Sequence, residues 1–206
     1  TLAKKIEAWE DALPENIHLA YLPNPTVGVR LRLTQFGGKA DFTPYLAELE
    51  MILGNAIYGE GEDTLQSVIG RELRASGKTL ALAESCTGGH LSELITSVAG
   101  CSDYYKGSVT SYSNEVKMKV LGVKSETLAK YGAVSDACVR EMAAGVLRVL
   151  DTDYAAASSG IAGPGGGSPE KPVGTAWLAA AKRLPDGSVT VATECVNFAS
   201  SRAVNI

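Results

Sequence analysis

The stretch Ala83-Glu84-Ser85-Cys86-Thr87-Gly88-Gly89 joins two sequence patterns of different period. Before it, the apolar run from Thr79 to Ala83 predicts a buried strand. After it, apolar residues recur at the spacing of one helix face, namely Leu91, Leu94, Ile95 and Val98. We therefore expect a strand that turns sharply into a helix, with the quoted residues at the turn.

The turn carries hydroxyl and thiol side chains, followed by two glycines. The first N–H groups of a helix have no partner within the helix and lie at the positive end of its dipole, so they can hold a phosphate or stabilise an oxyanion. Thr87, Gly88 and Gly89 are the candidates for such contacts, and Ser85 stands where a nucleophile elbow presents its hydroxyl. The alternative is that Ser85 or Thr87 only caps the helix.

The composition is that of an ordinary globular protein, and it argues against a nucleic-acid-binding protein, a membrane helix and a metal site. The 206 residues are 45% hydrophobic and 20% charged, and the net charge of −4 indicates no nucleic-acid partner. No apolar run approaches the roughly 20 residues of a membrane helix. Four scattered cysteines and two histidines, His18 and His90, do not form a metal-ligand pattern, so we expect reduced thiols in a cytoplasmic protein without a metal.

The periodicity of the chain changes near residue 62. Strands at 17–23 and 27–35 and a helix at 44–56, capped by Thr43, predict a small α+β module over residues 1–61. From residue 62 to 206 helices alternate with strands and end in a strand pair, with the clearest helix beginning after the cap Ser135-Asp136. This alternation predicts a three-layer α/β/α domain with a mixed sheet.

A second candidate segment is Thr110 to Lys117. A predicted strand ends near Tyr112, and a short helix capped by Ser113 carries Lys117 in its first turns. Ligands of open α/β sheets bind beyond strand ends, so both side chains are candidates for one crevice. The helix pattern by itself places Val116, Val120 and Leu121 on the buried face and Lys117 elsewhere, which would make Lys117 a solvated lysine.

The third candidate segment is the glycine-rich loop from Ser158 to Pro172. It contains Ser159, Gly160 and Gly163 as candidate ligand contacts, because a loop so rich in glycine lets its backbone approach a ligand closely. The loop lacks the lysine and hydroxyl residue of a phosphate-binding P-loop. A flexible surface loop is the rival interpretation.

Six motifs occur in a fixed order: AESCTGG (83–89), YSNEVK (112–117), LGV (121–123), GAVS (132–135), SGIAGP (159–164) and EKPVG (170–174). Together they resemble the C-terminal amidase domain of the CinA family, also known as nicotinamide-nucleotide amidase. The preceding YLPNP (21–25) and VRLRL (29–33) resemble the linking module of the family's long form. We therefore expect a piece of a longer protein with a further N-terminal domain.

The resemblance implies hydrolysis of nicotinamide mononucleotide to nicotinate mononucleotide and ammonia, without cofactor or metal, in a homo-oligomer. It implies Ser85, Tyr112 and Lys117 as catalytic residues, with Lys117 as base and Tyr112 as a proton relay between the other two. Amides of Gly88 and Gly89, or of Ser159 and Gly160, would bind the oxyanion.

The family's phosphate-binding arginine falls on Arg202, although Ser200 stands where its motif has glycine. Two other interpretations of the chain remain: a nucleotide-binding module without catalysis, and an interaction scaffold related to competence.

Overall fold

The computed structural model describes residues 1–24, 28–39, 41–198 and 200–205. It divides into two compact units, Thr1–Val68 and Ile69–Ile206. The domain boundary at residues 61 and 62 stays a prediction.

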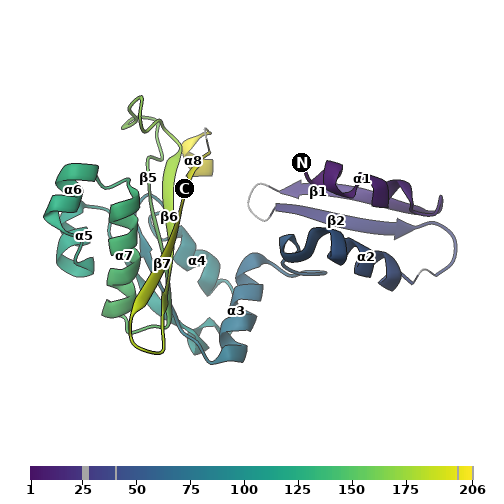
Figure 1. Cartoon of the computed structure of the whole chain (residues 1–206), viewed down its shortest axis with the longest axis horizontal. Helices are drawn as coiled ribbons and strands as arrows, with labels where there is room; N and C mark the ends of the chain where they lie inside the picture. The colour runs from purple at the N-terminus through teal and green to yellow at the C-terminus, as the bar shows by residue number, and fades with distance from the viewer. Residues whose placement is uncertain (25–27, 40, 199, 206) are drawn as a thin grey trace. The chain divides into compact units, whose positions relative to one another are not determined.

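The first unit is a small α+β module, as predicted. Its elements are α1 (Leu2–Asp11), β1 (Ile17–Asn24), β2 (Gly28–Gln35), α2 (Thr43–Leu53) and the 3-10 helix η1 (Gly54–Ala56). The strands pair antiparallel, and Ile6 and Trp9 of α1 pack with Leu49 of α2 in a core lined by strand residues (Figure 1).

Two details of this unit differ from the sequence prediction. Helix α1 was not predicted. The residue at the cap of α2 is Phe42 rather than Thr43, because Thr43 is already helical and its N–H is held by the Asp41 carboxylate at 3.0 Å. Val27, the predicted first residue of the second strand, lies outside the described residues.

The second unit holds a five-stranded sheet with helices on both faces (Figure 1). Its elements are α3 (Leu65–Ser76, which begins in the first unit), β3 (Leu80–Glu84), α4 (His90–Thr96), the 3-10 helix η2 (Cys101–Asp103), β4 (Tyr105–Thr110), α5 (Asn114–Leu121), α6 (Ser125–Tyr131), α7 (Asp136–Val149), β5 (Tyr154–Gly160), β6 (Thr175–Arg183), β7 (Val189–Asn197) and α8 (Arg202–Asn205). The sheet order is β4-β3-β5-β6-β7. Strands β4, β3 and β5 run parallel to one another, and β6 runs antiparallel to both of its neighbours, β5 and β7. The predicted mixed sheet is therefore confirmed.

Strand β3 is buried on both faces and separates two cores. Ala81 and Ala83 point into a core with α5 and α7, whereas Leu80 and Leu82 point into a core with α3 and α4. Successive side chains of a strand alternate between faces, which explains this division. Strand β3 lies inside the sheet, between β4 and β5, and its last residue, Glu84, directly precedes the Ser85 turn.

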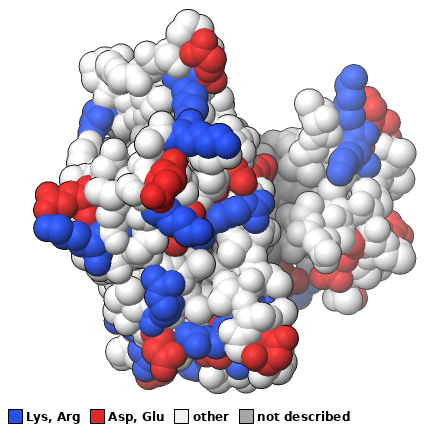
Figure 2. Space-filling view, turned by 60° about the vertical axis from the view of Figure 1, so that its left-hand side comes forward, with Lys and Arg blue, Asp and Glu red and all other residues white. Residues whose placement is uncertain are grey.

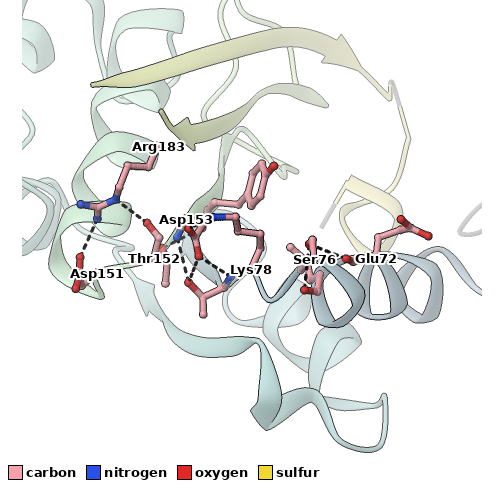
Figure 3. A network of polar contacts seen from close by, with 10 residues as sticks. Glu72, Ser76, Lys78, Asp151, Thr152, Asp153 and Arg183 are labelled. Carbon is pink, nitrogen blue, oxygen red and sulfur yellow. Dashed lines mark hydrogen bonds and ion pairs between the residues drawn. The ribbon is translucent and has the colours of Figure 1, made fainter. Parts of the chain in front are cut away.

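The amino ends of β3 and β5 are joined by a polar network (Figure 3). The Asp153 carboxylate accepts hydrogen bonds from Lys78 Nζ at 2.8 Å, Thr79 N at 3.0 Å and Thr79 Oγ1 at 2.9 Å. The bond from Lys78 is the main reason that the pKa of Asp153 lies below its ordinary value. This network links the start of β3 to the start of β5, at the end of the sheet opposite to the Ser85 turn.

Helix α7 begins as predicted, with Ser135 Oγ accepting from the N–H of Cys138. Helix α6 was not predicted, and β5 continues to Gly160, so it includes the first three residues of the segment from Ser158 to Pro172 that was predicted as a loop.

No helix in the described ranges is long and apolar enough to cross a membrane. Basic and acidic side chains are interspersed on the face of the molecule drawn in Figure 2.

Candidate active site

The end of β3 and the first turns of α5 meet at two buried side chains. Ser85, directly after β3, is 8% exposed, and Lys117 of α5 is 1% exposed. Lys117 Nζ lies 2.9 Å from Ser85 Oγ. Helix α5 begins at the predicted cap, where Ser113 Oγ accepts from the N–H of Val116. The structure therefore brings together two of the three residues implied to be catalytic.

The burial of Lys117 corrects the helix face predicted from sequence. Lys117 and Leu121 are the buried residues of α5, whereas Val120 is 40% exposed. Within the described part of the chain, no carboxylate forms an ion pair with Lys117; its Nζ contacts only neutral oxygens, including Ser111 O at 2.6 Å and Tyr112 O at 3.4 Å. Burial without a counter-ion lowers the pKa of Lys117 from its ordinary value.

The partners of Lys117 are compatible with both protonation states of its amine. The carbonyl oxygens of Ser111 and Tyr112 can only accept hydrogen bonds, whereas the Ser85 hydroxyl can also donate. As an ammonium, Lys117 Nζ donates to all three oxygens. Once neutral, it keeps two N–H groups for the two carbonyls and can offer its lone pair to the Ser85 O–H. In this protonation state the lysine is arranged to receive the serine proton.

The Tyr112 side chain lines the same pocket as Ser85 and Lys117, but within the described residues its hydroxyl forms no hydrogen bond with either of them. Its side chain is 62% exposed, and its hydroxyl accepts a long hydrogen bond of 3.5 Å from Arg202. Because Lys117 contacts Ser85 directly, the expected proton relay through Tyr112 is not the arrangement seen here. Ser111 is fully buried and Tyr112 exposed, as alternation beyond a strand end requires.

The helix N-terminus after the turn is occupied from within the chain. The Glu84 carboxylate accepts hydrogen bonds from the N–H groups of Gly89 at 3.0 Å and Leu91 at 3.0 Å, and the N–H of Gly88 donates to Ser85 O at 3.1 Å. Thr87 Oγ1 also turns inward, to Glu84 at 2.8 Å. The Thr87 hydroxyl and the N–H groups of Gly88 and Gly89 are thus paired within the chain, and their predicted contact with a phosphate or oxyanion stays a prediction.

Sequence reasoning missed Glu84 altogether. An acidic residue at the end of an otherwise apolar strand, just before two glycines, is the signal that could have revealed it. Burial raises the pKa of its carboxyl, but hydrogen bonds from Ser92, Thr87 and Leu91 outweigh this effect, and the pKa lies below its ordinary value.

The glycine-rich loop forms the opposite wall. A pocket of about 290 Å³ is lined by Ser85, Lys117, Tyr112 and Arg202 together with the segment 159–163. Ser159 and Gly160 belong to β5 rather than to a turn, and Ser159 Oγ donates to Ala133 O at 2.8 Å.

The carbonyl of Gly163 accepts a hydrogen bond of 2.7 Å from Arg202, which holds the arginine over the pocket. Gly163 has a φ of +86°, and a side chain there would collide with Val173, so the loop needs glycine at this position. At Gly160 a Cβ would lie 3.0 Å from Cys86 Sγ, so the strand packs closely on the turn at this point.

Cys86 is the other nucleophilic side chain at the turn. It is 8% exposed, and burial raises the pKa of its thiol, which disfavours the reactive thiolate. Its packing against Gly160 and the hydrogen bond between Lys117 and Ser85 distinguish the two neighbours: only the serine contacts a base.

The sequence pattern of the CinA C-terminal domain matches residues 62–206. The chain belongs to the CinA family. Among curated relatives of this CinA domain, a CinA-like protein of Cytophaga hutchinsonii is 46% identical over 184 residues, which are 87% of this chain and 44% of the relative. One of Chlorobium limicola is 42% identical over 209 residues, covering 99% of this chain and 48% of the relative. The chain thus spans about half the length of the curated relatives it matches.

Solved structures of the CinA superfamily share the fold. The competence damage-inducible protein A of Klebsiella pneumoniae is 40% identical with a TM-score of 0.63, covering 68% of this chain and 84% of that protein. A CinA superfamily protein of Escherichia coli is 29% identical with a TM-score of 0.62, covering 74% and 89% of the two chains.

Proposed function

We propose that this CinA domain hydrolyses the carboxamide of nicotinamide mononucleotide, giving nicotinate mononucleotide and ammonia. The observation that carries the proposal is the 2.9 Å contact between Ser85 Oγ and a buried lysine without a counter-ion. Amide hydrolysis needs an activated nucleophile and a group that returns a proton to the leaving nitrogen. A serine paired with a neutral lysine supplies both, as in Ser–Lys variants of the catalytic triad.

The reaction proceeds in two halves. Ser85 Oγ attacks the carboxamide carbon while its proton passes to Lys117 Nζ. The tetrahedral intermediate collapses as Lys117 returns that proton to the nitrogen, and ammonia leaves an ester on Ser85. Water then attacks the ester, Lys117 takes a proton from the water and gives it to Ser85 Oγ, and nicotinate mononucleotide is released.

Arg202 and Tyr112 form the remaining polar part of the proposed site. The Arg202 guanidinium, held by Gly163 O at 2.7 Å, offers a cationic fork suited to a phosphate at the pocket mouth. Tyr112 is proposed to act on the bound substrate rather than between Ser85 and Lys117, because those two groups are already in contact.

Mass-spectrometric detection of nicotinate mononucleotide, after incubation of the chain with nicotinamide mononucleotide, tests the proposal. We expect product with the parent protein and almost none with Ser85→Ala. Binding of the substrate by the parent without any release of ammonia would instead favour a nucleotide-binding module.

A further inference from the structure

The carboxylate of Glu84 organises the turn that presents Ser85. Glu84 is fully buried and directly precedes Ser85. Its Oε2 accepts from Thr87 Oγ1 at 2.8 Å and from the N–H groups of Gly89 and Leu91, each at 3.0 Å. Its Oε1 accepts from Ser92 N at 2.9 Å and Ser92 Oγ at 2.5 Å. One side chain thus closes a loop around the residues from 85 to 92.

The hydrogen bonds extend from Glu84 into both neighbouring strands. Thr87 Oγ1 contacts Ser158 Oγ of β5 at 2.9 Å. On the other side, Ser92 Oγ contacts Ser108 Oγ of β4 at 2.7 Å and the hydroxyl of Tyr105 at 2.9 Å. The network is partly buried, and its linked hydrogen bonds restrict the backbone of the turn.

The backbone of Glu84 reaches the other half of the catalytic pair. The N–H of Ser111 donates to Glu84 O at 2.7 Å, and Ser111 O in turn accepts from Lys117 Nζ at 2.6 Å. Residue 84 is therefore joined to Ser85 by the peptide bond and to Lys117 by the hydrogen bonds through Ser111.

The donors around Glu84 require a carboxylate. The five hydrogen bonds from Thr87, Gly89, Leu91 and Ser92 end on its two oxygens, and the three backbone N–H groups among the donors cannot reverse their direction. A glutamine of the same shape would turn its NH₂ group toward one set of these donors. Glu84→Gln therefore disturbs the turn without changing the size of the side chain.

We propose that Glu84 is a positioning residue for the reaction, which holds Ser85 Oγ at the Lys117 amine by fixing the turn around it. This inference rests on the proposed function and adds a residue that acts through Ser85 without touching the substrate. Small displacements of a nucleophile are costly, since about 1 Å can slow a reaction by roughly 10²-fold.

Asp153 supplies a matched control at the opposite end of the same sheet. Its carboxylate also accepts a backbone N–H and a threonine hydroxyl, both from Thr79. Asp153→Asn should therefore weaken the fold in a comparable way while leaving the Ser85 turn intact. The comparison separates positioning from general stability.

The experiment measures the rate at which a fluorophosphonate labels Ser85 in the parent, Glu84→Gln and Asp153→Asn proteins, with Ser85→Ala identifying the labelled site. Steady-state kcat and KM for nicotinamide mononucleotide and thermal unfolding are measured beside it. We expect Glu84→Gln to lower the labelling rate and kcat by roughly 10–10²-fold with little change in KM. Asp153→Asn should unfold at a lower temperature but label at the parental rate.

Labelling and kcat of folded Glu84→Gln at parental rates, or slowed no more than in Asp153→Asn, would overturn the proposal. If Glu84→Gln does not fold, Thr87→Val removes one donor from the same carboxylate, and parental rates in that variant overturn it equally. A parent that is labelled but releases no nicotinate mononucleotide removes the proposed function alone. A parent with neither labelling nor hydrolysis removes both.

Discussion

Lys117 Nζ lies 2.9 Å from Ser85 Oγ, although the two residues are 32 positions apart in the chain. One comes from the turn after β3 and the other from the first half of α5. Both are buried, and the contact needs no ion pair to hold it. The packing of β3 and α5 is what brings the two side chains together.

Ser85→Ala should abolish turnover, whereas Cys86→Ala should retain most of it. Only Ser85 contacts the lysine, and the raised pKa of Cys86 keeps its thiol protonated. We expect a loss of roughly 10³–10⁶-fold for the serine variant, as for nucleophiles of serine hydrolases. Ammonia release measures both variants, with weak inhibition by thiol-alkylating reagents as the companion result. The reverse ranking would assign the reaction to Cys86.

Activity should rise with pH as the buried lysine loses its proton. The pKa of Lys117 is lowered by burial, so the fraction of neutral amine increases through a range below that of an ordinary lysine. Lys117→Arg retains the charge but cannot act as a base, and kcat should fall by roughly 10²–10⁴-fold.

Calorimetric titration should show that the Lys117→Arg protein still binds nicotinamide mononucleotide. Turnover by this variant at near the parental rate would rule out Lys117 as the base.

The same pKa shift predicts how stability depends on pH. Because the pKa of Lys117 in the folded protein lies below its ordinary value of 10.5, the unfolded chain binds more protons between the two values. This residue therefore makes the free energy of unfolding rise with pH across that window. Lys117→Met removes the titration, so its stability relative to the parent should be highest below the folded-state pKa and decline toward pH 10.5.

Urea unfolding of the parent and of Lys117→Met at a series of pH values measures this difference. The hydrogen bonds lost in Lys117→Met change the unfolding free energy by an amount that does not depend on the titration. The test is therefore how the difference in unfolding free energy between the two proteins changes with pH. A difference that stays constant with pH would mean that burial does not shift the lysine.

Gly145→Ala should lower both stability and activity, because Gly145 of α7 lets α5 approach closely. A Cβ at this position would lie 2.1 Å from Leu121 O, and backbone cannot move aside as a flexible side chain can. We expect a loss of about 1–3 kcal/mol in unfolding free energy, together with a lower kcat, since α5 carries Lys117.

Gly70→Ala is the control for Gly145→Ala. Its Cβ would meet the buried Tyr104 hydroxyl at 2.5 Å on the other face of the sheet, so it should reduce stability but leave kcat near the parental value. Equal losses of kcat in both variants would show that stability alone limits turnover.

Extensive treatment with EDTA should leave activity unchanged. In the stretches that the structure describes, no three His, Cys, Asp or Glu side chains gather in a way that could hold a metal ion. The proposed chemistry draws its base from Lys117 rather than from metal-bound water. Activity lost on chelation and restored by zinc or magnesium would contradict this prediction.

The local features of the chain were readable from the sequence because they depend on neighbours within one or two turns. The alternation of helices and strands predicted the α/β/α layers and the mixed sheet, and the caps Ser113 and Ser135 were found at the helix starts where they were expected. The turn at Ser85 was located by the change of period on either side of it. The six motifs of the chain also predicted the CinA family, to which the chain belongs.

Tertiary structure decided what those residues face. Helical period placed Lys117 on the solvent side of α5, yet the packing of α5 on α7 through Gly145 turns it into the interior beside Ser85. The sequence pattern also predicted that N–H groups after the turn bind a ligand, but in the structure the N–H groups of Gly89 and Leu91 donate to the Glu84 carboxylate. Contacts between distant positions depend on how whole elements pack, and no pattern within a single element reports that. The sequence determined that Ser85 and Lys117 stand at a turn and in a helix, and only the tertiary structure decided that they contact each other.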